Sequence, residues 1–168
     1  MMVKADQLKV VLTECGISAA LEVVGERWSF LILRGAFNGL HHFEEFQSTL
    51  GIARNILSNR LARLVEHRIL HRDPDPADRR KVAYRLTERG RELLPVLIAM
   101  RQWGERWICD MPSNPVLIDR YSRRPIAPMA VRAADGRPLS LGDLEWVDRS
   151  ELAEEPAAPT RQMLASAS

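Results

Sequence analysis

The sequence predicts a mainly α-helical chain with a small amount of β structure, followed by a β-rich appendage. Three observations support this fold class. Apolar residues recur at helical spacing through most of the first 107 residues, one hairpin pattern interrupts the helices, and short strand-like segments follow residue 115. The chain has 168 residues, 46% of them hydrophobic, so it contains enough apolar surface to fold.

Three short helices are expected in the first fifty residues. The first runs from Ser18 to Val24 and is capped by its serine, and the second runs from about Glu26 to Phe37. An Asn-Gly turn signal then precedes residues 40–43, which are expected to form a short strand. The third helix covers Glu44 to Leu50 and ends before a glycine.

The fourth helix has the clearest periodicity in the chain. Between Ala53 and His67, leucines at positions 57, 61 and 64 share one face. The opposite face is largely polar and basic. It carries Arg54, Asn55, Ser58, Asn59, Ala62 and Arg63. This pattern predicts a helix with one buried side and one exposed side that can form hydrogen bonds.

A hairpin and a long helix are expected next. Ile69–Arg72 and Val82–Leu86 predict two strands, and the two prolines between them require a loop over residues 73–78. Thr87 can cap a helix from about Glu88 to Trp107. Pro95 predicts a kink or an interrupted hydrogen bond within that helix.

The hydrophobic pattern and composition of the sequence change after residue 110. Short strands are expected at residues 116–121, 126–132 and 144–147, and the composition from Glu151 onward is typical of a disordered tail. The expected organisation is a helical domain over residues 1–110, a small β-rich extension over 111–150 and a tail over 151–168.

Charge is distributed unevenly along the chain. Residues 50–91 contain eleven basic and five acidic side chains, a net charge of +6, whereas residues 140–168 have a net charge of −4. A basic middle with an acidic tail is typical of a polyanion-binding surface. Solvated helix faces are also often charged, so the asymmetry alone does not decide between these explanations.

Two short helices, a polar helix and a hairpin, in this order, predict a winged helix-turn-helix. An α-helix fits the major groove of DNA, where arginine can pair with guanine and asparagine with adenine. We therefore expect base contacts from the first two turns of the fourth helix, at Arg54, Asn55, Ser58 and Asn59. Phosphate contacts are expected from the hairpin tip and two other arginines. These residues are Arg79, Arg80, Lys81, Arg27 and Arg63.

Each of these features also has a plain structural explanation. Any surface helix shows a polar face, and a basic tip can simply keep a hairpin soluble and unpaired. The conjunction of element order, spacing and charge favours binding to double-stranded DNA.

Residues Cys15 to Trp107 resemble the HxlR-type winged helix-turn-helix family of bacterial and archaeal regulators, relatives of the MarR regulators. The segments that carry the resemblance are Ala20–Trp28, Leu31–Arg34, Phe43–Phe46, Gly51–Leu64 and Tyr84–Gly90. The resemblance implies a homodimer that binds operator DNA and regulates transcription, most often as a repressor. Ala53 stands where many relatives carry a capping serine.

The last long helix fits the homodimer that the resemblance implies. Apolar residues recur along it at helical spacing, and the expected interface residues are Leu97, Met100, Trp103 and Trp107. The alternative is that this stripe packs back on its own domain.

The extension resembles a C-terminal segment in which some HxlR relatives hold zinc with cysteine pairs. Tyr121, Ala133 and Gly136 stand at or near those places here, and the region contains neither cysteine nor histidine. We therefore expect no metal and no cofactor, because a structural zinc site needs four thiolate or imidazole ligands.

Cys15 is a candidate redox sensor. In several HxlR-type regulators a cysteine at this place responds to thiol oxidants or electrophiles, and a helix N-terminus favours the thiolate that such chemistry needs. Glu14 opposes that effect, and the alternative is a small buried apolar residue.

The sequence shows no nucleophile elbow, phosphate loop or paired zinc ligands, which argues against an enzyme and leaves no catalytic residue to name. It lacks a long apolar run and has two cysteines, so a cytoplasmic protein without a membrane partner is expected. The leading interpretation is a homodimeric transcription regulator that responds to thiol oxidation or a small effector. The alternatives are a small-molecule or partner-binding module with weak DNA binding and, with least support, a cysteine-dependent enzyme.

Overall fold

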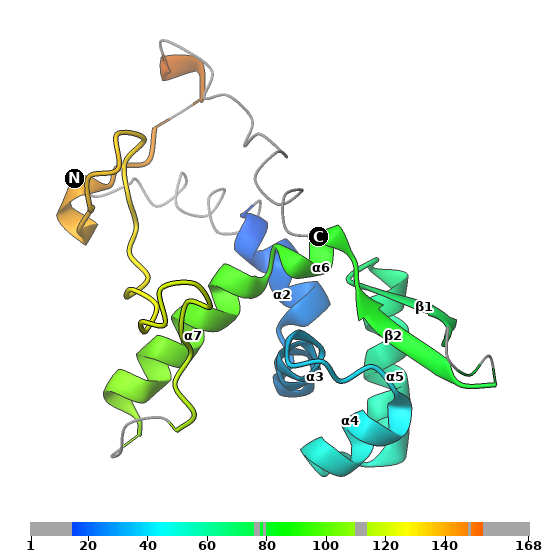
Figure 1. Cartoon of the computed structure of the whole chain (residues 1–168). Helices are drawn as coiled ribbons and strands as arrows, with labels where there is room; N and C mark the ends of the chain where they lie inside the picture. The colour runs from blue at the N-terminus through cyan, green and yellow to red at the C-terminus, as the bar shows by residue number, and fades with distance from the viewer. Residues whose placement is uncertain (1–14, 76–77, 79, 110–113, 148, 153–168) are drawn as a thin grey trace. The chain divides into compact units, whose positions relative to one another are not determined.

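The computed structural model describes residues 15–75, 78, 80–109, 114–147 and 149–152. These residues form two compact units, which divide between Met129 and Ala130. The helices and the hairpin that the sequence predicts all lie in the first unit (Figure 1).

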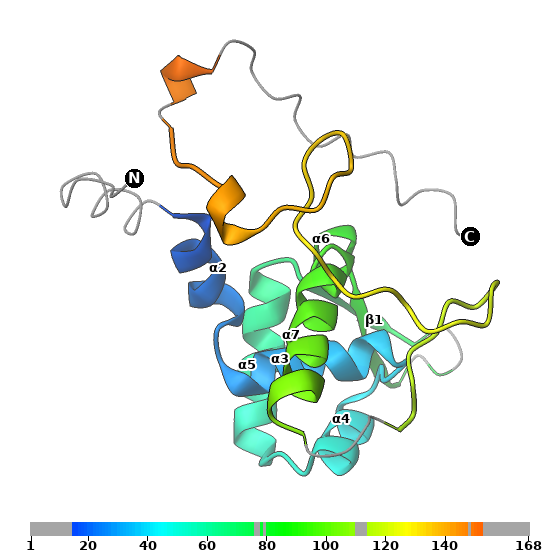
Figure 2. The same ribbon diagram turned by 90° about the vertical axis from the view of Figure 1, so that its left-hand side faces the viewer.

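In the part of the chain that the structure describes, four helices precede the hairpin, and their bounds are α2 (Gly16–Val24), α3 (Arg27–Phe37), α4 (Phe43–Leu50) and α5 (Arg54–Glu66). The helix α3 packs against α4, α5 and α7, while α2 contacts α5 (Figure 2). The helix α2 begins two residues earlier than the sequence predicts, because Cys15 and not Ser18 is its N-terminal cap. Gly51, the C-terminal cap of α4, has a φ of 61°, a left-handed conformation that favours glycine.

The hairpin consists of β1 (Leu70–Pro74) and β2 (Val82–Leu86), paired antiparallel from Leu70 opposite Leu86 to Pro74 opposite Val82. The strand expected at residues 40–43 is reduced to one bridge between His42 and Ala83, because α4 already begins at Phe43. The backbone carbonyl of His41 also accepts a hydrogen bond from the Tyr84 N–H at 2.7 Å. The segment before α4 is therefore attached to the outer edge of β2.

The long helix expected after the hairpin is interrupted, as Pro95 predicts. It is divided into α6 (Glu88–Arg91) and α7 (Leu94–Trp107), and Pro95 lies in the first turn of α7, where its missing N–H costs no helical hydrogen bond. Thr87 caps α6 through a side-chain hydrogen bond from the Gly90 N–H.

A single apolar cluster holds these elements together. Its fully buried members come from α3, α4, α5 and the start of β1, and the leucines at 57, 61 and 64 are among them as the periodicity predicts. The backbone approaches closely at Gly90, where an added Cβ would lie 2.2 Å from the Ile69 carbonyl oxygen.

The prediction of a β-rich extension is wrong. Among residues 114–147 only isolated bridges form, between Ile118 and Pro125 and between Arg132 and Pro138, with a 3-10 turn at Leu141–Asp143. Prolines explain the difference, because a residue without an N–H cannot donate to a strand ladder. Most of the expected tail lies outside the described residues, and Arg149–Glu151 form a short 3-10 turn.

Candidate nucleic-acid interface

The helix α5 presents the two faces that its sequence predicts. Its leucines enter the core, whereas the four side chains expected to contact bases are all exposed. These are Arg54, Asn55, Ser58 and Asn59. Because they lie in the first two turns of one helix, they form a single polar surface that can reach hydrogen-bonding groups on a ligand.

Arg54 is held at the start of this surface by an aromatic ring. Its guanidinium carbon lies 4.9 Å from the centre of the Phe43 ring, which belongs to the first turn of α4. The N-terminal cap of α5 is Ala53, which makes no side-chain capping hydrogen bond, as the absence of a serine predicts. The stacking limits the orientations of Arg54 while leaving its N–H donors accessible.

The tip of the hairpin carries exposed cations. Arg80 and Lys81 are exposed, and Arg79 lies outside the described residues. The guanidinium of Arg80 donates to the Asp78 carboxylate, with 3.1 Å between Nε and Oδ1, and this hydrogen bond lowers the pKa of Asp78. Arg80 therefore already has an anionic partner within the loop.

The two other arginines expected at phosphates have contacts of their own. The Arg27 guanidinium lies 5.1 Å from the centre of the Trp28 ring and is exposed at the start of α3. Arg63 donates from its guanidinium to the backbone carbonyl of Glu22 and so links α5 to α2. The phosphate contacts of both remain predictions.

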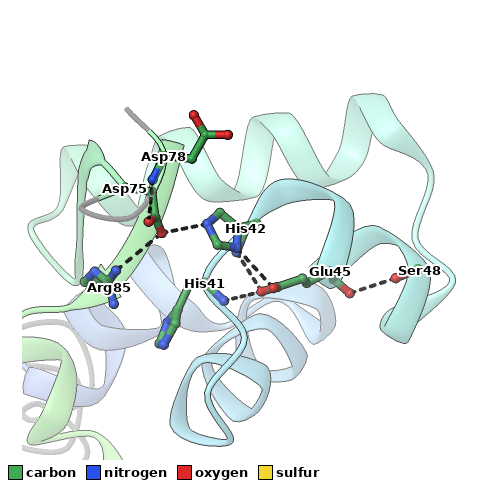
Figure 3. A network of polar contacts seen from close by, with 7 residues as sticks. All are labelled: His41, His42, Glu45, Ser48, Asp75, Asp78 and Arg85. Atoms are coloured by element: carbon green, nitrogen blue, oxygen red, sulfur yellow. Dashed lines mark hydrogen bonds and ion pairs between the residues drawn. The ribbon is translucent and has the colours of Figure 1, made fainter. Parts of the chain in front are cut away.

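A polar network that sequence reasoning missed lies at the base of the hairpin (Figure 3). The ring of His42 has Nδ1 3.0 Å from Glu45 Oε1 and Nε2 2.8 Å from Asp75 Oδ2. Arg85 on β2 lies 3.6 Å from the same oxygen of Asp75, and Asp75 is buried. The spacing of His42 and Glu45 matches a capping box, which is the only sign of the network in the sequence.

Glu45 is the acceptor for the start of α4. Its Oε2 accepts the backbone N–H of His41 at 2.8 Å and that of His42 at 2.9 Å. These two hydrogen bonds, with that of the His42 ring, lower the pKa of Glu45 to about 2. The carboxylate is therefore negatively charged at neutral pH.

The expected dimer stripe is divided along α7. Leu93 and Leu97 pack against the core of their own chain. On another side of the helix, four residues at the spacing i, i+4, i+7 and i+11 are exposed by about half or more of their area. They are Val96 (45%), Met100 (51%), Trp103 (61%) and Trp107 (64%). Leu97 thus packs on its own domain, whereas the interface role of Met100, Trp103 and Trp107 remains a prediction.

Cys15 caps α2 through its thiol. Its Sγ accepts the Ile17 N–H at 3.4 Å, and the residue is half-buried, while Cys109 is exposed. Among the described residues, no three His, Cys, Asp or Glu side chains gather closely enough to hold a metal ion. No helix in the same part of the chain is both long enough and apolar enough to cross a membrane.

Comparison with known proteins agrees with this geometry. The model of the HxlR-like helix-turn-helix family matches residues 23–111. An HTH-type transcriptional regulator of Mycobacterium tuberculosis is 40% identical over 106 residues, covering 63% of this chain and 67% of the relative. The HTH-type transcriptional regulator YodB of Bacillus subtilis is 32% identical over 92 residues, covering 54% of this chain and 82% of YodB.

Solved structures extend the similarity beyond the helical part. The crystal structure of PA1607, a protein assigned as a transcription factor, has a TM-score of 0.75 and 41% sequence identity. The match covers 83% of this chain and 98% of that one. A second assigned transcription factor, PA1374 from Pseudomonas aeruginosa, has a TM-score of 0.55 at 37% identity, with coverage of 87% and 96%.

Proposed function

Because the chain belongs to the HxlR-like helix-turn-helix family, we propose that it is a transcription regulator that binds a specific sequence in double-stranded DNA. The observation that carries this proposal is the polar surface of α5, whose four hydrogen-bonding side chains are all exposed while its leucines are buried. A rigid helix with such a surface can enter the major groove and form hydrogen bonds with base edges.

In the proposed complex, α5 reads the sequence and the hairpin supplies affinity. Arg54, Asn55, Ser58 and Asn59 contact base edges. The hairpin cations Arg79, Arg80 and Lys81 contact the phosphate backbone, which strengthens binding without selecting a sequence. Arg27 adds a phosphate contact from α3. Arg63 adds another if it exchanges its hydrogen bond to the Glu22 carbonyl of α2 for one to a phosphate.

The proposed active form is a homodimer that pairs through α7. Large apolar side chains that lie exposed on one helical stripe, two of them tryptophans, are typical of an interface. A dimer places two copies of α5 on one face of DNA, so that two half-sites about one helical turn apart are read together. The apolar residues Ile17 and Leu21 of α2 are also exposed.

Regulation is proposed to act as repression that an effector relieves. Cys15 is the proposed point of oxidant sensing, because its sulfur caps the N-terminus of α2 and the residue is only half-buried. Exposure of the chain to a thiol oxidant should then reduce DNA binding, and Cys15→Ser should remove that response. An oxidant effect that persists in Cys15→Ser would refute the sensing role.

A gel-shift titration with the DNA upstream of the chain's own coding region tests the proposed function. We expect a discrete complex that survives an excess of unrelated duplex at moderate salt. A chain that binds the upstream and the unrelated duplex equally would refute sequence-specific regulation and favour a partner-binding module.

A further inference from the structure

The ring of His42 joins the start of α4 to Asp75, which lies 33 residues further along the sequence at the base of the hairpin loop. His42 precedes the first turn of α4, whereas Asp75 directly follows β1 at the base of the hairpin loop. The ring nitrogens lie 3.0 Å from Glu45 Oε1 and 2.8 Å from Asp75 Oδ2, so the imidazole spans the space between the two carboxylates (Figure 3).

Only the doubly protonated ring satisfies both contacts. A neutral imidazole has one N–H donor and one acceptor, and an ionised carboxylate can only accept. Glu45 is held ionised by the two backbone N–H groups that it already accepts. Arg85 lies beside the same Asp75 oxygen that faces the ring, and its positive charge stabilises the negative charge there. Two carboxylates facing one imidazole therefore require an imidazolium.

The network continues from His42 to the cations of the hairpin. The Asp75 backbone N–H donates to the Lys81 carbonyl at 2.9 Å, which closes the loop. The other carboxylate oxygen of Asp75 accepts the Asp78 N–H at 3.3 Å, and Asp78 in turn holds Arg80. A chain of direct contacts thus runs from the start of α4 through Asp75 to the exposed guanidinium of Arg80.

We infer that His42 is a positioning residue for DNA binding: its imidazolium joins Glu45 to Asp75 and so fixes the hairpin cations relative to α4 and the adjoining α5. This inference rests on the proposed function, because it assigns the bridge a role in that same interface. Loss of the ring proton breaks one of the two charged hydrogen bonds and loosens the base of the hairpin. DNA affinity should therefore fall when His42 is deprotonated.

The charges around the ring set the direction of the pH effect. Glu45 on α4 and Asp75 on the loop face the two nitrogens, Arg85 on β2 lies beyond Asp75, and Asp78 and His41 flank the network. The hydrogen bonds to Glu45 and then to Asp75 raise the pKa of His42 above its ordinary value of 6.5. The bridge is consequently complete below about pH 6.5 and is lost as the pH rises through the raised pKa.

The first test measures the bridge without DNA. Nitrogen-15 and carbon-13 NMR of the imidazole rings in the full chain, with His42 assigned by comparison with His42→Gln, should show it protonated on both nitrogens at pH 6.5. The midpoint of its pH titration should lie above pH 6.5 and should shift to lower pH in Glu45→Gln. A His42 ring that titrates at or below the ordinary value would overturn the inference.

The second test measures DNA affinity from pH 6 to 9 at constant ionic strength, with the upstream fragment and a random-sequence duplex. The wild-type chain should weaken severalfold on both duplexes as the pH rises. His42→Gln should bind weakly throughout, and His42→Arg, which keeps a permanent positive charge, should recover affinity with a flatter profile. His71→Gln is the matched control, because His71 pairs with the exposed Asp73 on β1 outside the network and should keep the wild-type profile.

The outcomes separate the two proposals. If the wild-type chain binds no DNA at any pH, the proposed function and the positioning role both fail, while the NMR titration still decides whether the charged bridge exists. If it binds DNA and His42→Gln keeps the wild-type pH profile, only the positioning role fails. Circular dichroism of each variant establishes that it is folded, and Glu45→Gln supplies a second perturbation if His42→Gln is not.

Discussion

Alanine at Asn55 and alanine at Arg80 should weaken DNA binding in two different ways. Asn55 is exposed in the first turn of α5, and Arg80 is exposed at the tip of the hairpin. Removing a bidentate contact to a base edge costs about 1–3 kcal/mol per half-site. Asn55→Ala should therefore lose this amount at each half-site of the operator and much less on random DNA, whereas Arg80→Ala should weaken both alike.

The salt dependence separates the two variants more sharply. The logarithm of the binding constant falls with the logarithm of salt concentration with a slope of about −0.9 for each phosphate neutralised. A dimer that lacks Arg80 in both protomers loses two such contacts, so its slope should be shallower by about 1.8. Over a fourfold rise in salt this difference amounts to about twelvefold in affinity. Asn55→Ala should leave the slope unchanged.

Fluorescence anisotropy titrations at four salt concentrations, with operator and random duplexes, measure both quantities. If Asn55→Ala and Arg80→Ala gave the same profile across sequences and salt, the division between α5 and the hairpin would be wrong. An unchanged slope in Arg80→Ala would refute the phosphate contact itself.

Three further predictions concern assembly and stability. Trp103→Asp should leave a folded monomer that no longer binds the operator, because burying a charge in an apolar interface is unfavourable. Light scattering measures the oligomeric state, and a variant that stays dimeric would contradict the proposed interface. Gly90→Ala should lower the free energy of unfolding, measured in urea, by about 1–3 kcal/mol, because the added methyl group clashes with the Ile69 carbonyl. Gly104→Ala has open space around it and should raise the free energy of unfolding by about 0.5–1 kcal/mol. Glu45 should stabilise the fold above about pH 4.5 and lose this contribution as the pH falls toward 2, so urea titrations of Glu45→Gln should show a flatter acid limb.

Local patterns were sufficient to predict the helices and the hairpin. The leucines of α5 recur at helical spacing, and two prolines separate the strands, so periodicity and turn chemistry indicate these elements directly. The exposed face of α5 followed from the same periodicity, because the residues opposite a buried stripe must face solvent. The interruption near Pro95 was predictable for a similar reason, since proline removes an N–H wherever it stands.

Features that depend on tertiary contacts could not be predicted in this way. Alternating apolar residues after position 115 predicted strands, yet a strand forms only when a partner accepts and donates along its edge, and Pro125 and Pro138 cannot donate. The His42 network joins residues whose proximity is set by the pairing of residues 41–42 with β2. The spacing of His42 and Glu45 in the sequence indicates their contact at the start of α4, but nothing in the sequence indicates that Asp75 lies beside His42.

The cations of residues 50–91 show why a charge count is an incomplete measure of a DNA-binding surface. Among the described residues, five of them already have partners within the fold. These pairs are Arg60 with Glu26, Arg63 with the Glu22 carbonyl, Arg80 with Asp78, Arg85 with Asp75, and Arg91 with the Leu86 carbonyl. Arg60 is largely buried in its ion pair with Glu26, so it is poorly placed to contact a phosphate. Arg80 is almost fully exposed and can exchange Asp78 for a phosphate at little cost, because exposed ion pairs contribute little to stability. The count of eleven cations therefore overstates how many are available to DNA, and the salt dependence of binding should follow the hairpin cations instead of the total.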